Sequence, residues 1–249
     1  GLLAALLLAA APTLLYPPTR DQGVYAYVAD LMMHGGVPFR DAWDIKPPGI
    51  HLVYWLAFSL FGRSELAVRL FDLGYALTSA ASVCVLAWEV FRDRHIAFGS
   101  GWFYAFCYYL LVHFHSVATP EAFMAPFLVA SVYGIVRGTR SESNWALLCG
   151  GVASGFVFWF KPTAGLVIVA VLIWAYSAMR REGWDVGTAL RRLALVGLGG
   201  LLGLVPIGMY LYGHGLREFL EIWWAYGTGP YLEARGLALC DGPLATLDV

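Results

Sequence analysis

Charged residues are scarce in this sequence. They make up 13% of the 249 residues, against about a quarter in an average soluble domain. Hydrophobic residues make up 59%, and the mean hydropathy is +0.65. Such a composition indicates a chain that resides in a lipid bilayer. The formal net charge is −1, so the overall charge gives no indication of a nucleic-acid partner or a polyanionic substrate.

Paired cysteines, internal repeats and low-complexity tracts are also lacking. Three of the four cysteines lie inside apolar runs, and none has a paired spacing: Cys84, Cys107, Cys149 and Cys240. They are typical of small packing residues, so we expect neither a disulfide nor a metal–thiolate site. A single membrane domain over residues 1–249 is the simplest organisation. Because the chain starts at Gly1 inside an apolar stretch, we expect it to be a fragment of a longer protein.

The sequence contains several long runs of apolar residues. Most are close to the roughly 20 residues that cross a bilayer as a helix: Leu66–Phe91, Ile96–His113, Thr119–Val136, Trp145–Phe160, Pro162–Met179 and Leu193–Tyr212. The shortened N-terminal run Gly1–Tyr16 adds one more. A backbone that crosses lipid must satisfy its own hydrogen bonds. We therefore predict an all-α, polytopic transmembrane bundle of about seven spans.

Two shorter segments in the first long loop are predicted to lie along the membrane surface. Residues 21–34 repeat apolar side chains every three or four positions, which predicts an amphipathic helix. Glycines and a proline end it within residues 35–38. Residues 49–62 form an apolar stretch of 14 residues, which is short for a span and suits an interfacial helix.

The positions of Lys and Arg predict the orientation, but the answer depends on residues 49–62. If this segment lies on the surface, eight basic residues fall in short loops on one side and only Lys161 on the other. The basic side is then cytoplasmic. If the segment spans instead, the loop of residues 17–48 moves to the cytoplasmic face. We favour the surface interpretation, which places residues 17–65, 119–121, 161 and 213–236 together on the extracytoplasmic face.

Charged residues of this predicted outer face are candidates for chemistry, and each also has a simpler explanation. Asp21 either caps a helix or acts as a general base toward an acceptor hydroxyl. Glu121 either complements the dipole of the helix that begins there or faces Asp21 as a second carboxylate. Asp44 and Lys46 form either an ordinary charged turn before a Pro-Pro pair or a site where the lysine holds a lipid phosphate.

Two further sites allow the same kind of choice. Arg69 and Asp72 lie three residues apart on one predicted helix, so they either form a structural ion pair or leave Arg69 to contact a phosphate. Lys161 either extends its side chain to the interface or supplies a second cation. His113 and His115 could ligate a metal, but aromatic residues at the end of a span explain them more simply.

Four runs of the sequence carry a family resemblance. In order they are DQGVYAYVADLMMHGGVPFRDAWDIKPPGIHLVYWLAFSLFG, SELAVRLFDLGYALTS, TPEAFMAPF and FKPTAG. This order resembles the C-type membrane glycosyltransferases that use polyprenyl- or dolichyl-phosphate sugars, especially the bacterial group related to protein mannosyltransferases and aminoarabinose transferases, glycosyltransferase family 39. In that family the first outer loop has an acidic pair, a surface helix, a Lys-Pro-Pro element and a second surface helix.

The resemblance implies an enzyme of the bacterial inner membrane with an extracytoplasmic active site. It would move a sugar, with inversion, from a polyprenyl-phosphate donor to a hydroxyl of a glycan, lipid or protein acceptor. By position, Asp21 is similar to the catalytic acidic residue and Glu121 to the second one. The substrate-binding residues implied in the same way are Lys46, Arg69, Lys161 and Asp44.

Two departures from the family pattern qualify this expectation. The family often has Asp-Glu where this sequence has Asp21 and Gln22, so we predict that no divalent metal and no other cofactor is needed. The family also usually has more spans, and often a soluble outer domain after them.

Two other functions remain open. A transporter or lipid flippase would line a path through the bilayer with Arg69, Asp72 and Glu89. A noncatalytic subunit would only bind a partner through its outer loops. The clustering of polar residues at one face favours the enzyme.

Overall fold

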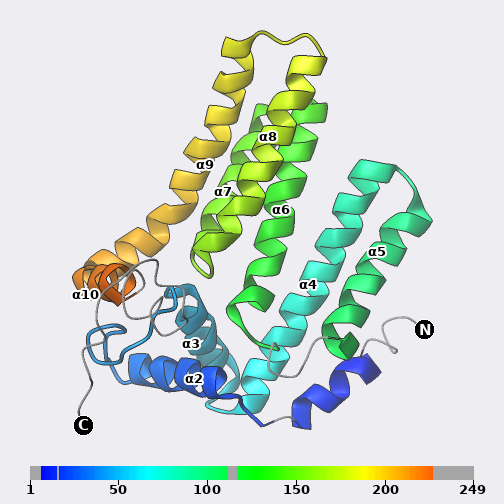
Figure 1. Ribbon diagram of the computed structural model, residues 1–249. Coiled ribbons are helices and arrows are strands. Elements are labelled where there is room, and N and C mark those ends of the chain that lie inside the picture. Colours follow the sequence, from blue (N-terminus) through cyan, green and yellow to red (C-terminus); the bar gives the residue numbers. More distant parts are fainter. Residues whose placement is uncertain (1–6, 16, 112–116, 227–249) are drawn as a thin grey trace, which may run out of the picture.

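The computed structural model describes residues 7–15, 17–111 and 117–226, and the regular structure in these ranges is helical (Figure 1). The α-helices are α2 (Arg20–Met33), α3 (Gly49–Phe61), α4 (Glu65–Phe91), α5 (Arg94–Phe106), α6 (Pro120–Arg140), α7 (Asn144–Phe158), α8 (Gly165–Arg181), α9 (Val186–Gly213) and α10 (Leu216–Glu221). Shorter elements are η1 (Ala11–Leu15), η2 (Cys107–Leu111), η4 (Pro162–Ala164) and η5 (Ile222–Tyr226). The predicted all-α fold is confirmed.

Four helices of the described ranges are long and apolar enough to cross a membrane. They are α4, α6, α9 and the continuous segment Pro162–Arg181 that contains η4 and α8. α5 and α7 are shorter and run beside them, α5 against α4 and α7 between α6 and α9 (Figure 1). The chain therefore has the architecture of an integral membrane protein, while the count of seven spans stays a prediction.

Glycine residues bring α6, α7 and α9 into close contact. A Cβ atom at Gly151 of α7 would lie 2.3 Å from the carbonyl oxygen of Val196 in α9. A Cβ atom at Gly199 of α9 would lie 2.2 Å from the carbonyl oxygen of Leu148 in α7. Small residues at helix interfaces let two backbones approach closely in lipid, where no hydrophobic force drives the helices together. These helices form the rigid support for everything at their ends.

The helix α2 and the helix α3 lie across one end of the bundle, at the foot of Figure 1, as the sequence predicted for residues 21–34 and 49–62. The α3 helix is buried on the side formed by Ile50, Val53 and Tyr54, which packs against Tyr25 of α2 and Phe123 of α6. We call this end the α2 end, and define it as residues 17–72, 117–121, 159–164 and 213–226.

The opposite end holds the connections from α4 to α5, from α6 to α7 and from α8 to α9 (Figure 1). We call it the basic end, and define it as residues 89–95, 137–146 and 180–192. The residues predicted to share the outer face, as far as they are described, all belong to the α2 end, and the eight loop arginines all belong to the basic end.

At the basic end, several charged side chains form ion pairs with one another or hydrogen bonds with the backbone at helix ends. The Glu89 carboxylate, 3% exposed, accepts from Arg92 at 2.6 Å and from Arg137 at 3.2 Å. Arg140 donates to the carbonyl oxygen of Glu89 at 2.8 Å, and Arg192 donates to that of Gly138 at 2.8 Å. Cations at a helix C-terminus satisfy carbonyl groups that have no partner within the helix. These arginines therefore hold the helix ends together.

Candidate functional site

Asp21 presents its carboxylate at the surface of the α2 end. It lies in the first turn of α2 and is exposed. Thr19 is the N-cap residue, since its hydroxyl accepts from the Gln22 N–H at 3.4 Å while the Gln22 Oε1 accepts from the Thr19 N–H at 3.1 Å. This reciprocal arrangement is a capping box. Thr19, and not Asp21, is therefore the cap of α2. The other explanation of Asp21, that it acts as a general base, stays open.

A buried carboxylate–histidine pair fixes the loop that carries Lys46. The Asp44 Oδ2 lies 2.8 Å from the Nε2 of His51, and the Asp44 Oδ1 accepts from the backbone N–H of Lys46 at 3.2 Å. His51 is fully buried and Asp44 is 8% exposed. Both oxygens of Asp44 have protein partners, which favours a supporting role over direct contact with a substrate. His51 was missed in the sequence, where its only signal is a polar side chain inside the apolar run of residues 49–62.

Lys46 is half-buried and lies two residues after Asp44 in the chain. Among the residues that the structure describes, no carboxylate forms an ion pair with its ammonium group. Pro47 and Pro48, both buried, restrict the backbone on its other side. The ammonium group is thus presented by a rigid backbone and is available to an anion.

Glu121 and Lys161, which are predicted site residues from distant parts of the sequence, meet at the α2 end. The Lys161 Nζ donates to the Glu121 Oε1 at 2.5 Å, and about half of each side chain is exposed. Glu121 lies in the first turn of α6 and Lys161 precedes η4. The pair therefore joins the beginnings of two long helices at one place.

Three carboxylates act on the hydroxyl of Tyr25, a residue of α2 that is 2% exposed. Burial raises the pKa of this phenol well above its usual range, and the negative charges of Asp21, Asp44 and Glu121 raise it further. A charge acts strongly on a titrating group only over a short distance in salt solution. Asp21, Asp44 and Glu121 come from three segments that all belong to the α2 end.

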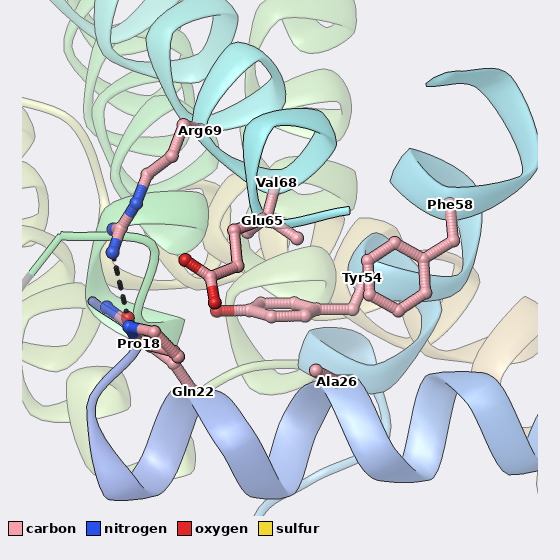
Figure 2. A pocket seen from close by; sticks show the side chains of 8 residues that line it. All are labelled: Pro18, Gln22, Ala26, Tyr54, Phe58, Glu65, Val68 and Arg69. Atoms are coloured by element: carbon pink, nitrogen blue, oxygen red, sulfur yellow. Dashed lines mark hydrogen bonds between the residues drawn. The ribbon is translucent and has the colours of Figure 1, made fainter. Parts of the chain in front are cut away.

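Arg69 is held between two helices rather than at the surface. It is 5% exposed, and its guanidinium donates to the Oε1 of Gln22 at 3.1 Å (Figure 2). Both side chains line a small cavity of about 40 Å³ between α2, α3 and α4. A volume of this size holds about one water molecule and is too small for a sugar. Figure 2 shows the other lining residues: Pro18, Ala26, Tyr54, Phe58, Glu65 and Val68.

Asp72, one helical turn beyond Arg69, has partners of its own. One carboxylate oxygen accepts from the Tyr108 hydroxyl at 2.5 Å and from the Ala118 N–H at 2.9 Å. Asp72 is 2% exposed. The contacts seen here direct Arg69 toward α2 and Asp72 toward the segment before α6, so each charged side chain of this turn ties α4 to a different neighbour.

An apolar groove of about 370 Å³ is lined in part by the prolines that follow the two lysines. Pro47, next to Lys46, and Pro162, next to Lys161, belong to its lining. The remaining lining residues come from α7, α9, α10, η5 and the residues that flank α3 and α7: Pro48, Phe158, Trp159, Leu204, Ile207, Gly208, Leu211, Phe219, Leu220 and Trp223. Arg69 is not among them, so the structure places this predicted phosphate contact at a different cavity.

Metal ligation finds little support in the described ranges. No group of three or more His, Cys, Asp or Glu side chains there is arranged to hold an ion. Gln22, beside Asp21, points to Arg69 and to the carbonyl oxygen of Val117. His113, His115 and Cys240 lie outside the residues that the structure describes. Metal independence stays a prediction.

One comparison with known proteins gives a match. Residues 45–210, about two thirds of the chain, match the model of a family described as dolichyl-phosphate-mannose-protein mannosyltransferase. The matched range includes Lys46, Arg69, Glu121 and Lys161, and it begins after α2 and Asp21. No curated protein and no solved structure matches the chain.

Proposed function

Because the chain belongs to the dolichyl-phosphate-mannose-protein mannosyltransferase family, and is therefore a membrane glycosyltransferase, we propose that it transfers a sugar from a polyprenyl-phosphate donor to an acceptor hydroxyl at the α2 end. The observation that carries the proposal is a convergence. Carboxylates of three separate segments and two lysines lie at the same end of the bundle, where the prolines that follow both lysines line an apolar groove.

The donor is held by two kinds of contact. The apolar groove takes the beginning of the polyprenyl chain, since burial of hydrocarbon there removes it from water. Lys46 binds the phosphate that joins this chain to the sugar, because this half-buried residue directly precedes Pro47, which lines the groove. Lys161 directly precedes Pro162, which also lines the groove, and it supplies a second cation for the phosphate. Its ammonium group then interacts with both the phosphate and its ion-pair partner Glu121.

Asp21 acts as the general base. It takes the proton of the acceptor hydroxyl as the hydroxyl oxygen forms a bond to the anomeric carbon of the sugar. The bond from that carbon to the phosphate oxygen breaks, and its electron pair leaves on the polyprenyl phosphate. Lys46 stabilises the negative charge that develops there. A single displacement of this kind inverts the anomeric configuration.

The positive-inside distribution supports an extracytoplasmic location of this chemistry. All eight loop arginines belong to the basic end, which is the cytoplasmic end by the rule that basic loops remain inside. The α2 end then faces outward, and in a bacterium this is the outer side of the inner membrane. The acceptor is a hydroxyl of a glycan, a lipid or a protein that reaches this side.

A transporter is less well supported by the same contacts. Glu89 is closed by two arginines at the basic end, and it follows Asp72 by 17 residues on α4, which is about 26 Å along the helix axis. A path through the bilayer would need polar groups between them on neighbouring helices. The known partners of Asp72 and Glu89 instead tie helices together.

The test uses the full chain reconstituted in liposomes with radiolabelled polyprenyl-phosphate mannose, and with hydroxylated peptides, glycans and lipids as acceptors. We expect label in an acceptor and release of polyprenyl phosphate when donor is present on the side of the α2 end. Movement of intact donor between leaflets without transfer would support the flippase instead. Neither transfer nor movement by the wild-type chain would contradict both and leave a noncatalytic subunit.

A further inference from the structure

Ala118, two residues before α6, has an unusual backbone conformation. Val117 and Ala118 are 1% and 0% exposed, and Ala118 has a φ of 56°. This is the left-handed region, where the Cβ of an alanine meets its own backbone and where glycine is the usual residue. A non-glycine residue stays in this region only where the surrounding contacts hold it there.

Side chains of three helices supply these contacts. Asp72 of α4 accepts from the Ala118 N–H at 2.9 Å, and Tyr54 of α3 donates its hydroxyl to the Ala118 carbonyl oxygen at 2.9 Å. Gln22 of α2 donates its amide N–H to the carbonyl oxygen of Val117. Every one of these groups is buried, so the loss of one would leave a polar atom without a partner away from water. We call this arrangement the Ala118 clamp, formed by Gln22, Tyr54, Asp72, Val117 and Ala118.

Additional hydrogen bonds orient two of the clamp side chains, Asp72 and Gln22. The Tyr108 hydroxyl donates to the same oxygen of Asp72 at 2.5 Å. Arg69 donates to the side-chain oxygen of Gln22 at 3.1 Å (Figure 2). The side-chain nitrogen of the same Gln22 donates to Val117. Tyr108 belongs to η2, a π-helical turn at the end of α5, and such turns are frequent at functional sites. The clamp therefore depends on α2, α3, α4 and η2 together.

The clamp connects the two carboxylates of the proposed reaction. Glu121 lies three residues after Ala118, in the first turn of α6, where the Ala122 N–H donates to the Thr119 carbonyl oxygen at 3.0 Å. The direction of the Ala118 peptide thus determines where this turn begins. Asp21 is adjacent to Gln22 on α2. One side chain, Gln22, therefore joins the backbone that carries Asp21 to the backbone that carries Glu121.

We propose that Gln22 and Asp72 are positioning residues of the glycosyl transfer, because they hold the Val117–Ala118 peptide and through it fix Glu121 relative to Asp21. The inference rests on the proposed function. It also accounts for a glutamine at position 22. A glutamate there would accept from Arg69 and from the Thr19 N–H equally well, but it could not donate to the Val117 carbonyl oxygen.

The first test compares Gln22→Glu with a matched control at the other end of the protein. Gln22→Glu keeps the number of non-hydrogen atoms in the side chain, replaces the buried NH2 donor by a carboxylate oxygen and adds a negative charge. A displacement of about 1 Å at a reacting group lowers a rate about 100-fold, so we expect kcat to fall by about this factor while the KM for polyprenyl-phosphate mannose changes little. Arg140→Gln removes a long-range bond to a backbone carbonyl at the basic end, and its kcat should stay at the wild-type value.

A pair of substitutions at Asp72 separates positioning from a need for its charge. Asp72→Asn keeps an oxygen that can accept from the Ala118 N–H, so its kcat should stay within a few-fold of wild type. Asp72→Leu has the same branched shape, is larger and has no acceptor, so its kcat should fall as far as that of Gln22→Glu. Equal loss in Asp72→Asn and Asp72→Leu would overturn the positioning role of Asp72.

Hydrogen exchange of residues 117–123 tests the clamp without any transfer assay. We expect exchange there to become about ten-fold faster in Gln22→Glu and in Asp72→Leu, but not in Arg140→Gln. If the wild-type chain transferred no sugar, the proposed function would fail, but hydrogen exchange would still show whether Gln22 and Asp72 hold residues 117–123 in place. Unchanged exchange in both variants would overturn the inference, and so would faster exchange with an unchanged kcat in an active enzyme.

Discussion

Both ends of this bundle form ion pairs, but they differ in which charged groups are left available to a substrate. At the basic end, Glu89, Arg92 and Arg137 close on one another, and Arg140 and Arg192 bond to the backbone at the ends of helices. At the α2 end, Asp21 is exposed outside the capping box, and Lys46 forms no ion pair with the described residues. Charges that stabilise a fold are satisfied within it, whereas charges that act on a substrate must remain available.

The largest expected effect comes from Asp21→Asn. Removal of a general base lowers a rate by about 10²–10⁴-fold, so transfer from polyprenyl-phosphate mannose should fall within this range. Because Asp21 is exposed and Thr19 caps α2, the melting temperature and the yield of inserted protein should match the wild type. Single-turnover assays in liposomes provide the measurement. Normal transfer by this variant would remove Asp21 from the reaction.

Lys46→Met should have the next largest effect on activity. Loss of one group that stabilises developing negative charge costs about 10²–10³-fold in kcat, and the methionine keeps the apolar part of the side chain. Lys46→Arg retains the charge and should recover part of the rate. Stability should change little in both variants, which circular dichroism during heating can check. A rate loss accompanied by an equal loss of folded protein would argue for a structural lysine.

Glu89→Gln should produce the reverse pattern at the basic end. The carboxylate is 3% exposed, but its arginine partners are about half exposed, so solvent weakens the pairs. We expect a loss of about 1–3 kcal/mol in the free energy of unfolding, the range for a buried group that loses a charged partner. The kcat of the folded fraction should not change. A large fall in kcat at constant stability would instead support a path for protons or ions through α4.

Lys161→Met should have the smallest effect on stability. The Glu121–Lys161 pair is about half exposed, and pairs of this kind contribute about 0–1 kcal/mol. A rise in the KM for the donor without a change in melting temperature would support its role as a second phosphate cation. Arg217→Met, which removes the exposed Arg217–Glu221 pair of α10, is the control, and its KM should equal that of the wild type.

The amino-acid order was sufficient for the general plan of the molecule. Runs of apolar residues predicted the helices, and the periodicity of residues 21–34 predicted α2 to within one residue at each end. The distribution of arginines predicted which connections share an end. These features depend on neighbours in the chain, because a helix is amphipathic, capped or apolar through residues three or four positions away.

Contacts between distant residues were beyond this kind of inference. Nothing in the sequence indicates that Gln22 reaches Val117, that His51 binds Asp44, or that Arg69 and Gln22 line one small cavity. The spacing of Arg69 and Asp72 left open an ion pair between them or a phosphate contact by Arg69, and it did not indicate their partners on α2, η2 and the segment before α6.

Local spacing thus accounts for which residues are helical and which end carries the basic loops. The packing of α2, α3, α4 and α6 accounts for the left-handed Ala118, the buried Asp44–His51 pair and the meeting of Glu121 with Lys161. The physical reason is that a helix forms bonds with its own backbone, but a buried polar side chain takes whichever partner the neighbouring helices bring within about 3 Å.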